Sequence, residues 1–133
     1  MEIVSVEMLQ QLGACLNQVD KFKSMFGEGK ILITRVRLDE AHRKGLNVEW
    51  WFCETHPEFK DEYEGRYKQI QACYLAKCKA NMHDSRTKRK ELPDQYTYKH
   101  EKIWDVHDDK YQKIWDEWQT NRINLIADLL GLD

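Results

Sequence analysis

The sequence contains few of the residues that interrupt regular structure, with only two prolines and six glycines in 133 residues. An all-β domain of this length needs many tight turns, which these two residues usually supply, so the composition favours helices. No run of about 20 apolar residues occurs, and we therefore expect no membrane-spanning helix. Glu2, rather than a basic segment, precedes the first apolar run, so we expect no secretory signal and predict a cytosolic protein.

Motifs for catalysis are also missing. Gly27-Glu28-Gly29-Lys30 lacks the glycine spacing and the magnesium-binding hydroxyl of a P-loop, and neither H-E-x-x-H nor a nucleophile elbow occurs. Zinc could use cysteines and His56, but Cys73 and Cys78 are five residues apart on a predicted helix. That spacing is about 500° of rotation, so the two thiols do not share a face. We predict a protein that is not an enzyme and that needs no cofactor and no metal.

The sequence does contain enough bulk for a folded core, because 41% of its residues are hydrophobic and 15 are aromatic. Its length allows one domain or two very small ones. The net charge is only -2, but residues 1–57 carry 7 basic and 8 acidic groups, residues 58–102 carry 11 and 8, and residues 103–133 carry 3 and 7. A basic middle and an acidic tail are typical of a polyanion-binding surface, or of oppositely charged faces that meet in an oligomer.

Apolar residues recur every three or four positions over residues 6–26, and this spacing predicts a first helix that ends at Gly27. The next segment, residues 30–36, contains β-branched residues that suit a short strand and leads into a helix start. Its conformation stays undecided at this point.

The segment LDEAHRKG predicts a short helix closed by Gly45, and Asn47 is a suitable N-cap for a second short helix, VEWWFCE. Two short helices joined by a glycine-containing turn predict a helix-turn-helix over about residues 38–55. Trp50 and Trp51 are neighbours, so only one can point fully into a core. The other is either a residue at the edge of the core or an exposed anchor for DNA or protein.

Thr55-His56-Pro57-Glu58 has the form of a capping box with proline in the first turn, and it predicts that a new helix begins near residue 57. An apolar stripe from Phe59 to Met82 predicts that this helix is long and amphipathic. Residues 83–99 lose the periodicity and concentrate basic side chains, so we predict an exposed connection there.

A last helix is predicted from the apolar and aromatic residues that recur between Trp104 and Leu132. Its stripe contains three tryptophans and is wider than one partner helix normally covers. We therefore expect burial between chains as well as within one chain.

The region from residue 38 to residue 80 resembles the small terminase subunits of tailed bacteriophages. The residues that carry the resemblance are Gly45, Phe52, the run His56-Pro57-Glu58-Phe59, and Tyr63. The resemblance implies a non-catalytic protein of the host cytoplasm that recognises viral double-stranded DNA for packaging and assembles as a ring. It also implies delivery of the DNA to the terminase large subunit, which supplies the ATPase and nuclease activities.

On this interpretation residues 1–56 form a helical DNA-binding unit and residues 57–133 form a helical oligomerisation region. The predicted DNA-binding residues are Arg35, Arg37, Arg43, Lys44, Asn47, Glu49, Arg86, Lys88, Arg89 and Lys90. The predicted oligomer interface consists of Tyr67, Tyr74, Trp104, Tyr111, Trp115, Trp118, Leu125 and Leu129.

Two other functions fit the sequence. One is a helical phage accessory or inhibitor protein that acts through protein–protein contacts, which suits the nearly neutral charge. The other is a helix-turn-helix transcription regulator, for which a two-fold dimer rather than a ring is expected.

Overall fold

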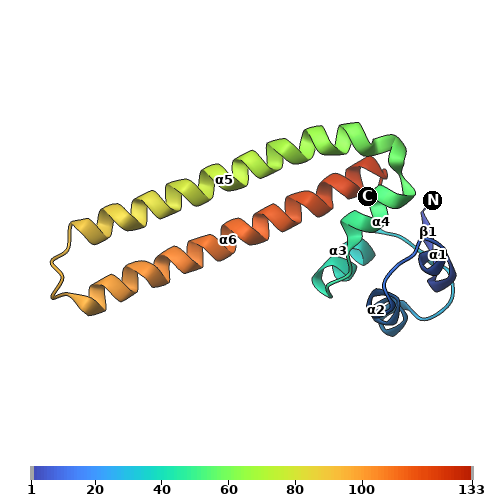
Figure 1. The fold of residues 1–133 in the computed structure, drawn as a ribbon, viewed down its shortest axis with the longest axis horizontal. Coiled ribbons are helices and arrows are strands. Elements are labelled where there is room, and N and C mark those ends of the chain that lie inside the picture. Colours follow the sequence, from blue (N-terminus) through green and yellow to red (C-terminus); the bar gives the residue numbers. More distant parts are fainter. Residues whose placement is uncertain (1, 133) are drawn as a thin grey trace. The chain divides into compact units, whose positions relative to one another are not determined.

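The computed structural model describes residues 2–132 and has six α-helices, one 3₁₀ helix and two short strands in that range (Figure 1). The prediction of an all-α fold is confirmed. The chain divides into two compact units. We call residues 2–65 with 123–132 the small-helix unit, and residues 66–122 the hairpin unit. Within the described residues, no helix has the length and apolar character needed to cross a membrane.

The small-helix unit begins with β1 (Ile3–Val4), α1 (Val6–Gln11), α2 (Leu16–Phe26) and β2 (Ile31–Leu32). The prediction of one helix over residues 6–26 is wrong, because the chain turns at Gly13 with φ of 84°. The N–H of Ala14 then donates to the carbonyl of Leu9, which completes a Schellman motif. A left-handed residue cannot continue a helix, although the apolar spacing passes across it without interruption.

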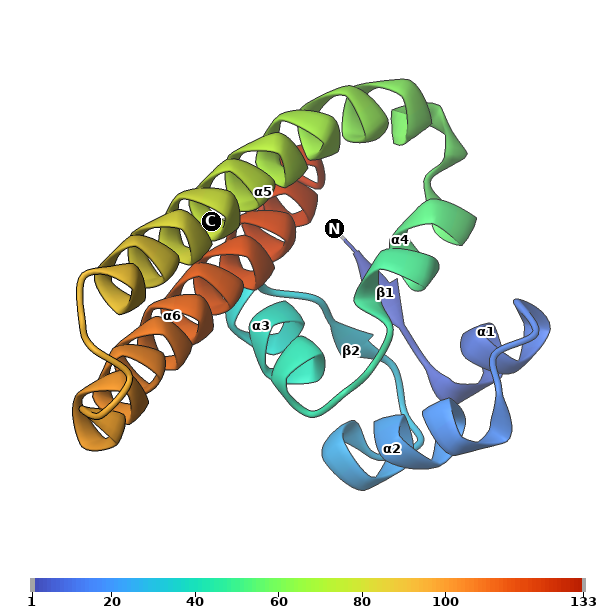
Figure 2. The ribbon, with the colours of Figure 1, turned by 60° about the vertical axis from the view of Figure 1, so that its left-hand side comes forward.

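Residues 30–36, whose conformation the sequence left undecided, contain both a short strand and the start of a helix. The first part is strand β2, which pairs antiparallel with β1 so that Ile3 lies opposite Leu32 and Val4 opposite Ile31 (Figure 2). The last part begins helix α3 (Arg35–Arg43), whose N-cap is the hydroxyl of Thr34.

The two short helices predicted on either side of Gly45 are present as α3 and α4 (Val48–Thr55). Gly45 has φ of 89° and ends α3 in a second Schellman motif. The side chain of Asn47 caps α4 by accepting the backbone N–H of Trp50 at 3.0 Å. The two short helices are therefore confirmed, whereas their assignment as a DNA-binding helix-turn-helix stays a prediction.

After α4 the chain forms a 3₁₀ helix, η1 (Pro57–Phe59), and then α5 (Lys60–Lys90). The long helix is confirmed, but the predicted capping box is wrong. The hydroxyl of Thr55 donates to the carbonyl of Trp51 at 2.7 Å, so it closes the last turn of α4 and caps nothing beyond it.

The core of the small-helix unit includes residues from the far end of the chain. Phe52, Leu38 and Ile126 have the largest fully buried side chains, and Ile123, Leu125 and Ala127 are also buried. The contacts therefore group residues 123–132 with the first 65 residues, whereas the sequence-based division ran between residues 56 and 57.

The hairpin unit consists of α5 from residue 66 to its end and of α6 (Thr97–Leu129) up to residue 122, and the two helices run side by side in Figures 1 and 2. The exposed connection between the helices is present, but it covers only residues 91–96, so the predicted bounds of 83–99 are too wide. Among residues 66–122 no hydrophobic side chain is fully buried; the buried residues there are Asn81 and Ser85. The two helices thus cover each other only partly.

Candidate nucleic-acid interface

Arg35, the first predicted DNA-binding residue, is used inside the small-helix unit. Its guanidinium donates to Asn124 Oδ1 at 2.9 Å, to Asp128 Oδ1 at 2.7 Å and to the carbonyl of Leu132 at 3.3 Å. Three acceptors from the end of the chain engage both terminal nitrogens of the guanidinium, and they use three of its five N–H donors. Arg35 therefore attaches the C-terminal segment to α3.

The other cations of α3 differ in how available they are. Arg37 donates to the carbonyl of Leu32 at 2.7 Å, and Arg43 forms an ion pair with Asp39 one turn earlier. Lys44 is exposed, and no ion pair is found for it in the described part of the chain. This helix therefore offers a phosphate mainly Lys44, with weaker contributions from the two arginines.

The predicted recognition helix, α4, has an acidic outward face. Its buried side consists of Val48, Trp51 and Phe52, which leaves Glu54 exposed and Glu49 half-buried. Burial raises the pKa of the Cys53 thiol, and the negative charges of Glu49 and Glu54 raise it further. The same negative potential opposes the approach of a phosphate group to this helix.

Sequence analysis placed the second group of cations in a loop, but they lie on the last turns of α5. Lys88 forms an ion pair with Asp84 at 3.1 Å, and the Arg89 guanidinium lies 5.0 Å from the centre of the Trp104 ring. Arg86 and Lys90 are exposed. Cations at a helix C-terminus are stabilised by the helix dipole, which helps to explain why these residues are helical.

Two further lysines join this group from the start of α6. Lys99 Nζ lies 5.0 Å from the centre of the Tyr96 ring, and Lys102 Nζ lies 4.9 Å from that of Tyr98. We call residues 86–102 the hairpin end. It carries six basic and three acidic side chains, a formal charge of +3.

Sequence analysis missed the tyrosines and lysines of α6 because it treated their segment as an irregular connection. The signal that could have identified them is their spacing. Tyr96 and Lys99 are three residues apart, Tyr98 and Lys102 are four apart, and both spacings bring side chains together on a helix.

The predicted interface residues lie in different environments. Tyr74 stacks on Trp118 at 4.9 Å and its hydroxyl is 3.1 Å from that of Tyr111, so these residues join the two helices of the hairpin unit. Tyr111 and Trp115 are 41% and 36% exposed. The remaining predicted interface residues also contact their own chain. Tyr67 lies under the guanidinium of Arg122, and Trp104 contacts Arg89 and His107. In the small-helix unit, Leu125 is buried and Leu129 is half-buried.

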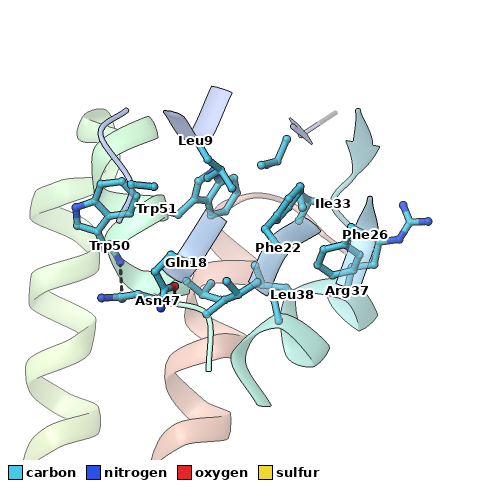
Figure 3. A pocket seen from close by; sticks show the side chains of 15 residues that line it. Leu9, Gln18, Phe22, Phe26, Ile33, Arg37, Leu38, Asn47, Trp50 and Trp51 are labelled. Atoms are coloured by element: carbon cyan, nitrogen blue, oxygen red, sulfur yellow. Dashed lines mark hydrogen bonds between the residues drawn. The ribbon is translucent and has the colours of Figure 1, made fainter. Parts of the chain in front are cut away.

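A small apolar cavity of about 60 Å³ lies in the core of the small-helix unit (Figure 3). Leu9, Phe22 and Leu38 line it, together with the half-buried ring of Trp50. Trp51 is buried beside it, so Trp50 is the residue at the edge of the core. A space of this size holds about two waters by volume, and we interpret it as a packing gap in the core.

Four of the residues that carry the terminase resemblance, Phe52, His56, Phe59 and Tyr63, pack against one another in the small-helix unit. The ring of Phe52 stacks on those of His56 and Phe59 at 5.5 Å and 6.1 Å, and it lies 5.4 Å from that of Tyr63. These residues make one aromatic cluster, so their pattern reflects packing and not contact with a ligand.

No group of three or more metal-binding side chains comes together among residues 2–132. Cys73 and Cys78, whose spacing on a helix was considered above, both lie on α5. In comparisons with protein-family models, curated proteins and solved structures, no match to this chain was found.

Proposed function

We propose that this chain is a non-catalytic DNA-binding protein of the small-terminase kind, which recognises viral double-stranded DNA for packaging and assembles from several copies. It would deliver the DNA to a separate ATPase and nuclease subunit. The observation that supports DNA binding best is the excess of basic side chains at the hairpin end. Lysine and arginine side chains that contact phosphates give affinity without reading the base sequence.

The hairpin end is the better of the two candidate DNA surfaces. At the other, Arg35 already donates to three acceptors of its own chain, Arg43 is paired and α4 carries Glu49 and Glu54. At the hairpin end, Arg86 and Lys90 are exposed, and Lys99 and Lys102 lie within contact distance of tyrosine rings at the surface. Phosphates are therefore attracted more strongly to the hairpin end.

The first prediction concerns the salt dependence of duplex binding. Changing Arg86, Lys88, Arg89 and Lys90 together to glutamine, which keeps helix propensity, removes the predicted phosphate contacts of α5. We expect the slope of log affinity against log salt concentration to become shallower by about 2–4, since each phosphate contact contributes about 0.9. Fluorescence anisotropy with a labelled duplex over a salt series measures this slope.

The matched comparison is the double variant Arg43→Gln with Lys44→Gln, which neutralises the cations near the predicted helix-turn-helix. We expect its slope to change by less than about 1. The opposite result, with a large change in the double variant and none in the quadruple variant, would move the DNA contact to α3 and α4.

A second prediction concerns assembly. The hairpin unit buries no hydrophobic side chain fully, and Tyr111 and Trp115 remain exposed on α6. Exposed aromatic residues of this kind are favoured at protein interfaces, where a central tryptophan can dominate the binding energy. Light scattering coupled to size exclusion should therefore give a mass of several copies over a concentration series.

The double variant Tyr111→Ala with Trp115→Ala should need a concentration about tenfold higher or more to assemble. Val36→Ala, which truncates an exposed side chain on α3, should leave the mass unchanged. A dimer would favour the transcription regulator instead. A monomer at all concentrations would favour the accessory protein, with Trp115 as part of its contact surface.

A further inference from the structure

The side chains of Tyr96 and Tyr98 at the hairpin end are exposed, although binding to duplex phosphates uses only the cations there. Their exposed fractions are 42% and 68%. Tyr96 immediately precedes α6, where its N–H donates to the carbonyl of Pro93 at 3.1 Å, and Tyr98 lies in the first turn of the helix. A turn therefore holds Tyr96 and the helix holds Tyr98, and both side chains are exposed at the protein surface.

Each ring has a cation over one of its faces, and a base would stack on the other face. The ammonium groups of Lys99 and Lys102 lie 5.0 Å and 4.9 Å from the ring centres, and Lys90 and Arg86 end the neighbouring helix. A nucleotide whose base stacks on an aromatic ring needs a positive group nearby for its phosphate. The hairpin end supplies an aromatic ring with a positive group near it twice within a few residues.

A duplex cannot use the tyrosine rings in this way. Its bases stack on one another and present only their edges in the grooves, so a ring at the protein surface has no base face to contact. Duplex binding through phosphates needs the cations alone. The exposed tyrosine rings therefore suit unpaired bases, which present their faces, better than paired ones.

We propose that the hairpin end binds unpaired nucleotides, with bases stacked on Tyr96 and Tyr98 and with phosphates held by Lys99, Lys102 and the cations that end α5. The ligand is a single-stranded stretch of nucleic acid, such as the strand exposed at an unpaired end. This inference rests on the proposed function to the extent that both use the same cations. It adds a preference for unpaired bases, which phosphate contacts alone do not give.

The test compares three fluorescein-labelled ligands by anisotropy: oligothymidylate of about 20 nucleotides, an abasic strand of the same length, and a duplex of the same length. We expect wild-type protein to bind oligothymidylate about tenfold or more tightly than the abasic strand, which has the phosphates without the bases. The double variant Tyr96→Leu with Tyr98→Leu should lose about tenfold or more in affinity for oligothymidylate. Its affinity for the duplex should change less than about twofold.

The variant Tyr96→Phe with Tyr98→Phe retains both rings, and its affinity for oligothymidylate should stay within about twofold of wild type. Circular dichroism of each variant checks that the helices remain. Equal binding of the abasic strand and oligothymidylate, or no loss in the leucine variant, would overturn this inference. Retained salt-dependent duplex binding would leave the proposed function standing in that case, whereas failure to bind any of the three ligands would overturn both.

Discussion

Phe52→Ala should lower the free energy of unfolding of the small-helix unit by about 3–5 kcal/mol, the usual cost of removing a buried aromatic ring. Phe52 is only 1% exposed. Its ring contacts the rings of His56, which lies between α4 and η1, of Phe59 in η1 and of Tyr63 in α5. Truncation to alanine therefore leaves a cavity that the rigid helical backbone cannot fill.

Urea unfolding followed by near-ultraviolet circular dichroism measures this loss, because the aromatic cluster contributes to that signal only when it is packed. The matched control is Leu16→Ala on α2, whose side chain is 80% exposed and should cost less than about 1 kcal/mol. Similar losses in the two variants would show that Phe52 is not at the centre of the core. A loss of 3–5 kcal/mol is a large part of the stability of a small domain, so the variant should be partly unfolded at room temperature.

Local signals in the sequence predicted the segment from Gly45 to α5 well, since each of its boundaries depends on one residue. Gly45 takes up the left-handed conformation, Asn47 caps α4, and Pro57 begins η1 where its missing N–H costs nothing. These preferences act between residues close in the chain, so the printed sequence is enough to detect them.

Two errors had the same physical origin, because apolar periodicity reports burial and not helix formation. The spacing continued through Gly13, where the backbone turns, and it disappeared after Met82, where the backbone stays helical. In the second case an ion pair between Asp84 and Lys88 and favourable helix propensities support the last turns of α5 without apolar contacts. The basic residues 86–90 were therefore predicted to lie in a loop, whereas they lie on a helix, and their role in binding stays a prediction.

Contacts between distant segments could not be predicted. Strands β1 and β2 have two residues each, too few for a pattern, and they pair across more than 20 intervening residues. The attachment of the C-terminal segment depends on Arg35, whose acceptors lie about 90 residues later. A positive side chain near a helix start suggested a phosphate contact, whereas the partner was a carboxylate at the other end of the chain.

The C-terminal segment should be as important to the small-helix unit as its own helices. Ile126 is 0% exposed and Leu125 is 2% exposed, both among the best-buried residues of that unit. Ile126→Asp should therefore lower the free energy of unfolding by at least about 4 kcal/mol, because it places an unpaired charge in an apolar core. Near-ultraviolet circular dichroism during urea unfolding measures this effect as well.

Two companion variants make the result specific. Ile126→Ala removes apolar contacts without adding a charge and should cost about 2–5 kcal/mol, which places it between wild type and the aspartate variant. Thr120→Asp adds the same charge two turns earlier on α6, at an exposed position, and should cost less than about 1 kcal/mol.

A variant of the neighbouring residue Leu125 separates folding from assembly at the end of the chain. Leu125 was predicted to lie between copies. Truncation of a residue at such an interface lowers the mass in solution and leaves the fold of each copy intact. Truncation of a residue that packs inside its own chain lowers the free energy of unfolding even in a monomer. We expect Leu125→Ala to behave in the second way, because its side chain is already covered by the small-helix unit. Normal urea stability with a reduced solution mass would instead return Leu125 to the interface and show that this unit does not need the C-terminal segment.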